Sequence, residues 1–194
     1  VRKVLAFSDN YELGLLVASA GFGTGGNFLD ANIEDEVNMV DVNCSALLRM
    51  AHHVAHRFAS LLRGGIILMS SLVAFQGVPY SANYAATKAY VQSLAEGLRV
   101  EMEAFKVDVL AAAPGPVNSG FGSRADMVMN GALSPDQVGP SILKALGRKG
   151  TVFPGFFSKF LTASLSMMPR WAKVRVMKLV MGGMTAHQRE KAVA

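Results

Sequence analysis

The sequence of 194 residues predicts an α/β fold, in which a parallel sheet is covered by helices on both faces. Short apolar runs alternate with longer segments of helical periodicity, which is the pattern of right-handed βαβ units. With 51% hydrophobic and 17% charged residues, the chain has enough apolar side chains for one substantial core and an oligomer interface. We therefore expect a single domain over residues 1–194.

Each predicted element follows from a local pattern. Residues 1–14 are expected to end a helix that leads into the first strand. Ser134, Pro135 and Asp136 combine a cap with a proline in the first turn, which marks a helix start. The predicted strands are Gly14–Ala18, Gly65–Met69, Val107–Ala112 and Gly150–Phe153. The predicted helices are Glu34–Leu62, Ala82–Phe105 and Pro135–Leu146.

Three side chains suited to proton transfer lie close together in the sequence: Ser71, Tyr84 and Lys88. Tyr84 and Lys88 are four residues apart in an Ala-rich helical stretch, so both side chains rise from one helix face. A nearby ammonium favours the phenolate, and Lys88 is therefore expected to lower the pKa of Tyr84. Ser71 ends an apolar strand thirteen residues before Tyr84 and could hold a substrate carbonyl against the phenol. The trio suits interconversion of a carbonyl and an alcohol.

Further motifs surround this trio in order. Ala-Ser-Ala-Gly (18–21) follows the first strand, Asn43 lies in the first long helix, and Pro-Gly-Pro-Val-Asn-Ser (114–119) follows the third strand. With these features, residues 14–155 resemble the short-chain dehydrogenase/reductase family. The chain departs from the family pattern at residues 18 and 19, where Ala and Ser replace two asparagines.

The resemblance implies a role for each matched residue. Tyr84 would act as the acid in reduction and the base in oxidation, and Ser71 would orient the carbonyl. Considered alone, Asn43 also fits an ordinary helix asparagine and Pro114-Gly115 an ordinary turn. The implied catalytic residues are Asn43, Ser71, Tyr84 and Lys88. The implied cofactor-binding residues are Ala20, Gly21, Tyr84, Lys88, Pro114, Gly115, Val117 and Ser119, the last in place of a family threonine.

The Gly-rich turn that opens a dinucleotide-binding fold has no counterpart before Gly14. The resemblance therefore implies a partial Rossmann-like sheet without the N-terminal strands, whose apolar strand at Leu15–Ala18 is an exposed edge. The implied cofactor is NADP or NAD, with NADP slightly favoured, and the substrate is a small carbonyl compound or alcohol. The opposing hypothesis is a non-catalytic remnant or interaction protein that keeps the fold but cannot hold a dinucleotide.

Residues 155–184 form a basic, apolar extension that is expected to be helical. Its cations, with no acid among them, are Lys159, Arg170, Lys173, Arg175 and Lys178. Packing on its own domain or on a partner subunit is the favoured interpretation, and peripheral contact with an anionic membrane is the alternative. The apolar stretch before Pro169 is too short to span a bilayer. Either arrangement points to an apolar substrate.

The remaining side chains narrow the class of protein. His52 and His56 share a helix face without nearby carboxylate or thiolate ligands, so we expect a solvated or interface face and no metal site. The resemblance implies a homo-oligomer through the two long helices. Cys44 is the single cysteine, which excludes an internal disulfide and favours a reducing, cytoplasmic location. A net charge of +5 could attract nucleic acid, but no base-reading module is present, so no nucleic-acid partner is expected.

Overall fold

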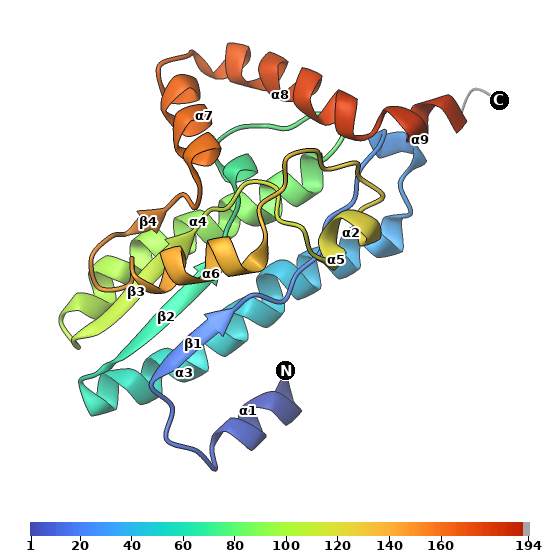
Figure 1. Ribbon diagram of the computed structural model, residues 1–194. Coiled ribbons are helices and arrows are strands. Elements are labelled where there is room, and N and C mark those ends of the chain that lie inside the picture. Colours follow the sequence, from blue (N-terminus) through green and yellow to red (C-terminus); the bar gives the residue numbers. More distant parts are fainter. Residues whose placement is uncertain (192–194) are drawn as a thin grey trace.

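The computed structural model, which describes residues 1–191, is built around four parallel strands (Figure 1). They are β1 (Leu15–Ala18), β2 (Gly64–Met69), β3 (Val107–Ala112) and β4 (Thr151–Val152). The strands lie in the order β1-β2-β3-β4, and the register places Ile66 of β2 beside Leu16 of β1 and Val109 of β3. All four carboxyl ends therefore meet at one edge of the sheet, where polar loop residues can converge.

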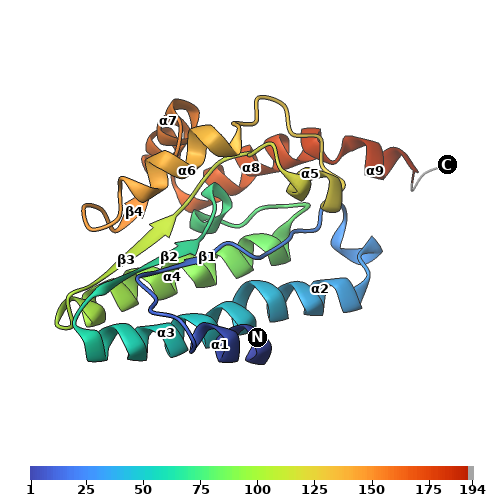
Figure 2. The ribbon, with the colours of Figure 1, turned by 60° about the horizontal axis from the view of Figure 1, so that its bottom comes forward.

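Helices cover both faces of the sheet, so the predicted three-layer arrangement is confirmed (Figure 2). Two long helices, α3 (Leu47–Leu61) and α4 (Ala82–Glu103), cover one face, and α6 (Pro135–Leu143) covers the other. Side chains of β2 alternate between the two cores. Leu68 packs with the α3 and α4 side, whereas Ile67 packs with the α6 side.

The remaining helices lie around this framework. They are α1 (Arg2–Ser8), α2 (Ile33–Val40), α5 (Gly120–Arg124), α7 (Phe156–Ser166), α8 (Arg170–Met184) and α9 (Ala186–Lys191). Helices α7 and α8 form an arm at the top of Figure 1, and α8 packs through Met177 and Met181 against the residues that follow α5. Within residues 1–191, no helix is both long and apolar enough to cross a bilayer.

Local signals place most element boundaries close to those predicted. Asn32 caps α2 by accepting a hydrogen bond from the Glu34 N–H at 2.9 Å, and Ser134 and Gln137 form a capping box at α6. Gly64 has a φ of +137°, and a Cβ there would lie 2.4 Å from the Phe58 ring, so only glycine fits this first position of β2.

Four expectations differ from the structure. The helix expected over 34–62 contains a π-helical segment, Asp41–Ala46, between α2 and α3. The segment after the Pro-Gly motif, where no helix was predicted, forms the short helix α5, and Ser119 caps it by accepting a hydrogen bond from the Phe121 N–H at 3.4 Å. Helix α6 ends at Leu143, three residues before its predicted end. Strand β4 keeps only two of the four residues predicted for it.

Strand β1 is an exposed apolar edge, as expected. Leu15 and Val17 share one face of the strand and remain 38% and 46% exposed. Only β2 pairs with β1 among the described strands, so the other side of β1 has free backbone groups.

Candidate active site

The candidate site lies at the carboxyl edge of the sheet, where residues from distant parts of the chain meet. Ser71 follows β2 and begins a 3₁₀ turn, Leu72–Phe75. Its neighbour Leu72 donates a backbone hydrogen bond to the Pro114 carbonyl at 3.1 Å, which joins the loops after β2 and β3. Helix α4 passes beneath these loops and contributes Tyr84 and Lys88, one turn apart.

Lys88 is a buried amine directed at the sheet edge. Its Nζ donates a hydrogen bond to the carbonyl of Met69 at 2.8 Å and lies 5.7 Å from the centroid of the Tyr84 ring. Burial disfavours the charged ammonium and lowers the pKa of Lys88 to about 8. Near neutral pH, this amine is therefore mostly protonated but can exchange its proton.

Tyr84 is buried, and its ionisation differs from the expectation. Burial raises the pKa of Tyr84 to about 12, and a hydrogen bond with the Ser71 side chain offsets only part of that effect. The predicted lowering by Lys88 is therefore wrong for this structure. The Tyr84 ring is enclosed by Phe22, Met39 and Phe121, and the cost of burying a phenolate among them dominates. At neutral pH, Tyr84 is a neutral phenol and a proton donor.

Asn43 connects the loop after β1 to α4. It is 1% exposed and lies in the π-helical segment. Its Oδ1 accepts from the Phe22 N–H at 3.1 Å, and its Nδ2 donates to the Phe22 carbonyl at 2.8 Å and to Thr87 Oγ1 at 3.0 Å. A π-helical insertion changes the direction of side chains within a helix, and such segments are frequent at functional sites. Here, it places the amide beside the Tyr84–Lys88 turn.

Gly21 comes close to both Asn43 and Lys88. A Cβ at this position would lie 2.8 Å from Asn43 Oδ1 and 3.6 Å from Lys88 Nζ, so the backbone approaches Asn43 more closely than a side chain would permit. Ala20, the preceding residue, is exposed. The structure thus brings together Asn43, Ser71, Tyr84, Lys88 and Gly21.

The Pro-Gly motif forms a second wall. A Cβ on Gly115 would lie 2.8 Å from Ser158 Oγ of α7 and 3.2 Å from the Leu72 side chain, so glycine allows these segments to meet. Val117 makes an isolated β-bridge with Leu133. Ser119 is exposed at the start of α5 and is linked to Tyr84 through Phe121.

Phe121 and Arg124 of α5 are site residues that sequence reasoning missed. The Phe121 ring lies 5.2 Å from the Tyr84 ring, and the Arg124 guanidinium lies 4.3 Å from the Phe22 ring. Helix α5 therefore shields the phenol from solvent. A possible capping serine, Ser119, two residues before Phe121 was the available signal, but a helix of five residues has too little periodicity to detect.

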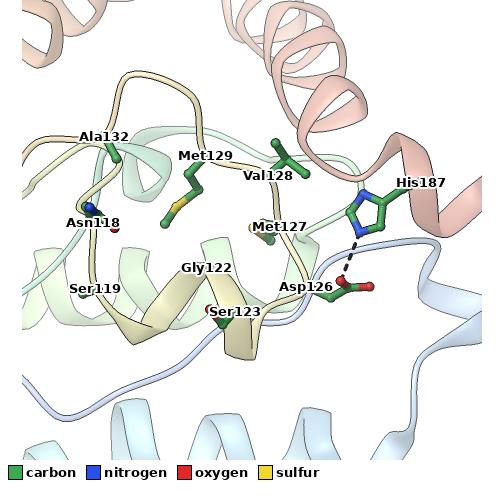
Figure 3. Close-up of a pocket in the computed structure, with 10 residues that line it drawn as sticks. All are labelled: Asn118, Ser119, Gly122, Ser123, Asp126, Met127, Val128, Met129, Ala132 and His187. Carbon is green, nitrogen blue, oxygen red and sulfur yellow. Dashed lines mark ion pairs between the residues drawn. The ribbon is translucent and has the colours of Figure 1, made fainter.

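A cavity of about 420 Å³ adjoins α5 (Figure 3). Its walls include Ser119, Met127 and Met129, and His187 of α9 closes one side through an ion pair with Asp126 at 3.0 Å. Tyr84 is not among the described residues that line this cavity. The two methionines thus line a cavity beside the site, in the segment between α5 and α6.

The parallel sheet, the strand-end loops and the Tyr84–Lys88 helix are the features of a nicotinamide-linked dehydrogenase fold. The family described as short chain dehydrogenase matches residues 5–127, and the chain belongs to this family.

Curated relatives agree with this family. The chain is 26% identical over 160 residues to 7beta-hydroxysteroid dehydrogenase from Mediterraneibacter gnavus, covering 79% of this chain and 61% of that protein. It is 33% identical over 115 residues to 3-ketodihydrosphingosine reductase from Bacteroides thetaiotaomicron, covering 59% of this chain and 42% of the reductase. The chain therefore spans less than two thirds of the length of these relatives.

Solved structures share the fold. A structure from a study of 7beta-hydroxysteroid dehydrogenase stereoselectivity aligns with a TM-score of 0.80 at 24% identity, covering 91% of this chain and 70% of that one. A short chain dehydrogenase from Burkholderia cenocepacia J2315, in complex with NADP, aligns with a TM-score of 0.77 at 23% identity. This second match covers 86% of this chain and 70% of the other.

Proposed function

We propose that this protein is an oxidoreductase that interconverts a carbonyl compound and a secondary alcohol with a nicotinamide dinucleotide. The observation that carries the proposal is the grouping of the half-buried Ser71 with the buried Tyr84 and Lys88 at the strand ends. A neutral phenol hydrogen-bonded to a serine, with a titratable amine nearby, is suited to passing a proton to or from a substrate oxygen.

Each residue would have one task in this reaction. In reduction, the Tyr84 hydroxyl donates its proton to the carbonyl oxygen while the Ser71 hydroxyl holds that oxygen by a hydrogen bond. The Lys88 ammonium then stabilises the resulting phenolate and can return a proton to it, since its own pKa is about 8. In oxidation, the same proton transfers run in reverse. Asn43 keeps the Gly21–Phe22 loop in place beside Lys88.

The residues present fit the nicotinamide end of such a cofactor. The Lys88 ammonium has three N–H donors, and one of them bonds to the Met69 carbonyl. Its other donors can therefore bind ribose hydroxyls. Ala20 and Gly21 would border the ribose, whereas Pro114, Gly115, Val117 and Ser119 would border the nicotinamide. When bound, the cofactor supplies the hydride in reduction and accepts it in oxidation. We favour NADP slightly over NAD, because structural neighbours solved with NADP or NADPH outnumber the one solved with NADH among those compared.

The proposed substrate is an apolar ketone or its alcohol. Met127 and Met129 add flexible apolar contacts to the cavity beside α5, whose lining also includes the polar Asn118. Two relatives are named for a steroid and for 3-ketodihydrosphingosine. We also propose that the protein forms a homo-oligomer through α3 and α4, whose outer surfaces expose Leu48, Tyr90 and Val100.

The proposal is tested by cofactor titration followed by turnover assays. The protein would be titrated calorimetrically with NADPH and NADH and then mixed with the preferred cofactor and a panel of apolar ketones. We expect saturable binding of one cofactor and loss of reduced-nicotinamide absorbance with at least one ketone. If neither NADPH nor NADH binds, the proposal is contradicted and a non-catalytic protein is favoured. Gly21→Val should weaken cofactor binding, because its side chain would displace the loop from Asn43.

A further inference from the structure

The outward side of α7 and α8 combines apolar and basic side chains, and we call it the C-terminal face. Its apolar members are Phe156, Phe160, Met167 and Trp171. Its cations are Lys159, Arg170, Arg175 and Lys178. The arm that carries this face stands apart from the sheet in Figure 1.

The apolar members of the face are unusually exposed for a folded domain. Phe156 is 84% exposed and Met167 is 90% exposed. They lie on one side of α7, and the Phe156 and Phe160 rings stack with 6.4 Å between centroids. The opposite sides of the two helices already pack on the domain through Leu165, Met177 and Met181. The arm is therefore docked on the fold while its outward side remains open to another surface.

The charge of this region is uniformly positive. The sequence contains no Asp or Glu between Asp136 and Glu190, so acidic neighbours in the sequence do not neutralise these cations. Arg175 lies over the Trp171 ring, 5.2 Å from its centroid, which joins the basic and aromatic members. A partner that matches the face must therefore be anionic and must also accept aromatic and aliphatic groups.

We propose that the C-terminal face docks on the surface of an anionic lipid bilayer. Tryptophan side chains prefer the headgroup level of a membrane, and each Lys or Arg near anionic lipid adds to the electrostatic attraction. In this proposal, the outward sides of α7 and α8 contact the membrane surface without inserting across it. A second copy of the same face would place cations against cations, and nucleic acid would leave Met167 exposed to water.

Vesicle binding tests this proposal without depending on catalysis. Trp171 is the single tryptophan of the chain, so its fluorescence reports on the face itself. We would add vesicles of phosphatidylcholine, with or without phosphatidylglycerol, and vesicles carrying brominated acyl chains. We expect a blue shift and bromine quenching with the anionic vesicles, weakened by salt, and little response to neutral vesicles. The proposal would be overturned if the Trp171 fluorescence did not shift with anionic vesicles, a result that would favour an acidic protein partner. Equal binding to neutral and anionic vesicles would overturn it as well.

Two charge variants separate this face from general attraction by net charge. The double variant Arg170→Gln/Lys178→Gln should bind anionic vesicles at least about tenfold more weakly. The matched variant Lys144→Gln/Arg148→Gln removes the same charge from the turn between α6 and β4 and should bind like the parent. High salt screens the attraction between charges, so any vesicle binding that remains there depends on apolar contacts. The double variant Phe156→Ser/Phe160→Ser should lose this remaining binding. Equal losses in the two charge variants would contradict a specific docking face.

Discussion

At the residue scale, burial controls the protonation of the Tyr84–Lys88 pair. It raises the pKa of Tyr84 to about 12 and lowers the pKa of Lys88 to about 8. Both shifts favour the neutral form, since a low-dielectric site disfavours either charge. The 5.7 Å between Nζ and the ring centroid is compatible with attraction between ammonium and phenolate, but burial outweighs it. Tyr84 therefore keeps its proton near neutral pH and can donate it to a substrate oxygen.

The buried amine predicts a specific dependence of stability on pH. Below about pH 8, Lys88 is charged in both the folded and unfolded states, so the fold bears the full cost of burying the ammonium. Between about pH 8 and its ordinary pKa of 10.5, only the unfolded state keeps the proton. The free energy of unfolding should therefore rise with pH, relative to Lys88→Met, by roughly 3 kcal/mol across this window.

Urea unfolding of the wild type and Lys88→Met, measured from about pH 7 to about pH 10.5, checks this prediction. Groups far from Lys88 contribute equally to both proteins, so the difference reports on Lys88 and on the Cys44 thiol that interacts with it. A difference that stays constant or narrows as the pH rises would show that the amine is not penalised by burial.

At the element scale, α5 covers the ring of Tyr84 through Phe121. Phe121→Ala should admit water to the Tyr84 hydroxyl and lower its pKa from about 12 toward 10. Ultraviolet titration of tyrosinate measures this change, and subtracting the corresponding Tyr84→Phe curve removes the other three of the four tyrosines. An unchanged Tyr84 pKa would mean that Phe121 does not control access to the phenol.

Helix α8 should be held to the domain by one side only. Met177 and Met181 are 3% and 4% exposed, whereas Leu179 on the same helix is 79% exposed. Met177→Ala should lower the free energy of unfolding by about 2–4 kcal/mol, because it removes buried apolar atoms and leaves a cavity. Leu179→Ala should change it by less than about 0.5 kcal/mol. Denaturant unfolding compares the two, and equal effects would contradict the packing described for α8.

The sequence predicted elements with long, regular patterns and missed features that depend on tertiary contacts. Strand β3 and the start of α4 agree with their predicted positions, since apolar runs and loop residues bound them clearly. The π-helical segment around Asn43 was missed, because a single short insertion shifts the register of a long helical pattern only locally. The ionisation of Tyr84 was predicted in the wrong direction because Phe121, distant in sequence, completes its burial.

At the scale of the whole molecule, the open edge of β1 should promote association between copies. Leu15 and Val17 are exposed beside unpaired backbone groups, and such edges can pair with another chain. We expect Val17→Lys to reduce concentration-dependent self-association of the 194-residue chain in sedimentation velocity. Val128→Lys adds the same charge in a loop and should have little effect. Equal reduction by both variants would indicate a general charge effect.

The proposed activity depends on parts of the fold that meet only at the strand ends. β2 leads to Ser71, α4 provides Tyr84 and Lys88, and the segment between α2 and α3 supplies Asn43. The central claim is that these residues form one proton-transfer site whose acid is the Tyr84 hydroxyl.

The most direct test is the turnover number of Tyr84→Phe, measured with the cofactor and ketone that the titration and screen identify. The substitution removes one hydroxyl and keeps the ring among Phe22, Met39 and Phe121. We predict a loss of about 10²- to 10⁴-fold in kcat, with the cofactor Kd nearly unchanged. Turnover close to that of the wild type would contradict the assignment of Tyr84 as the acid.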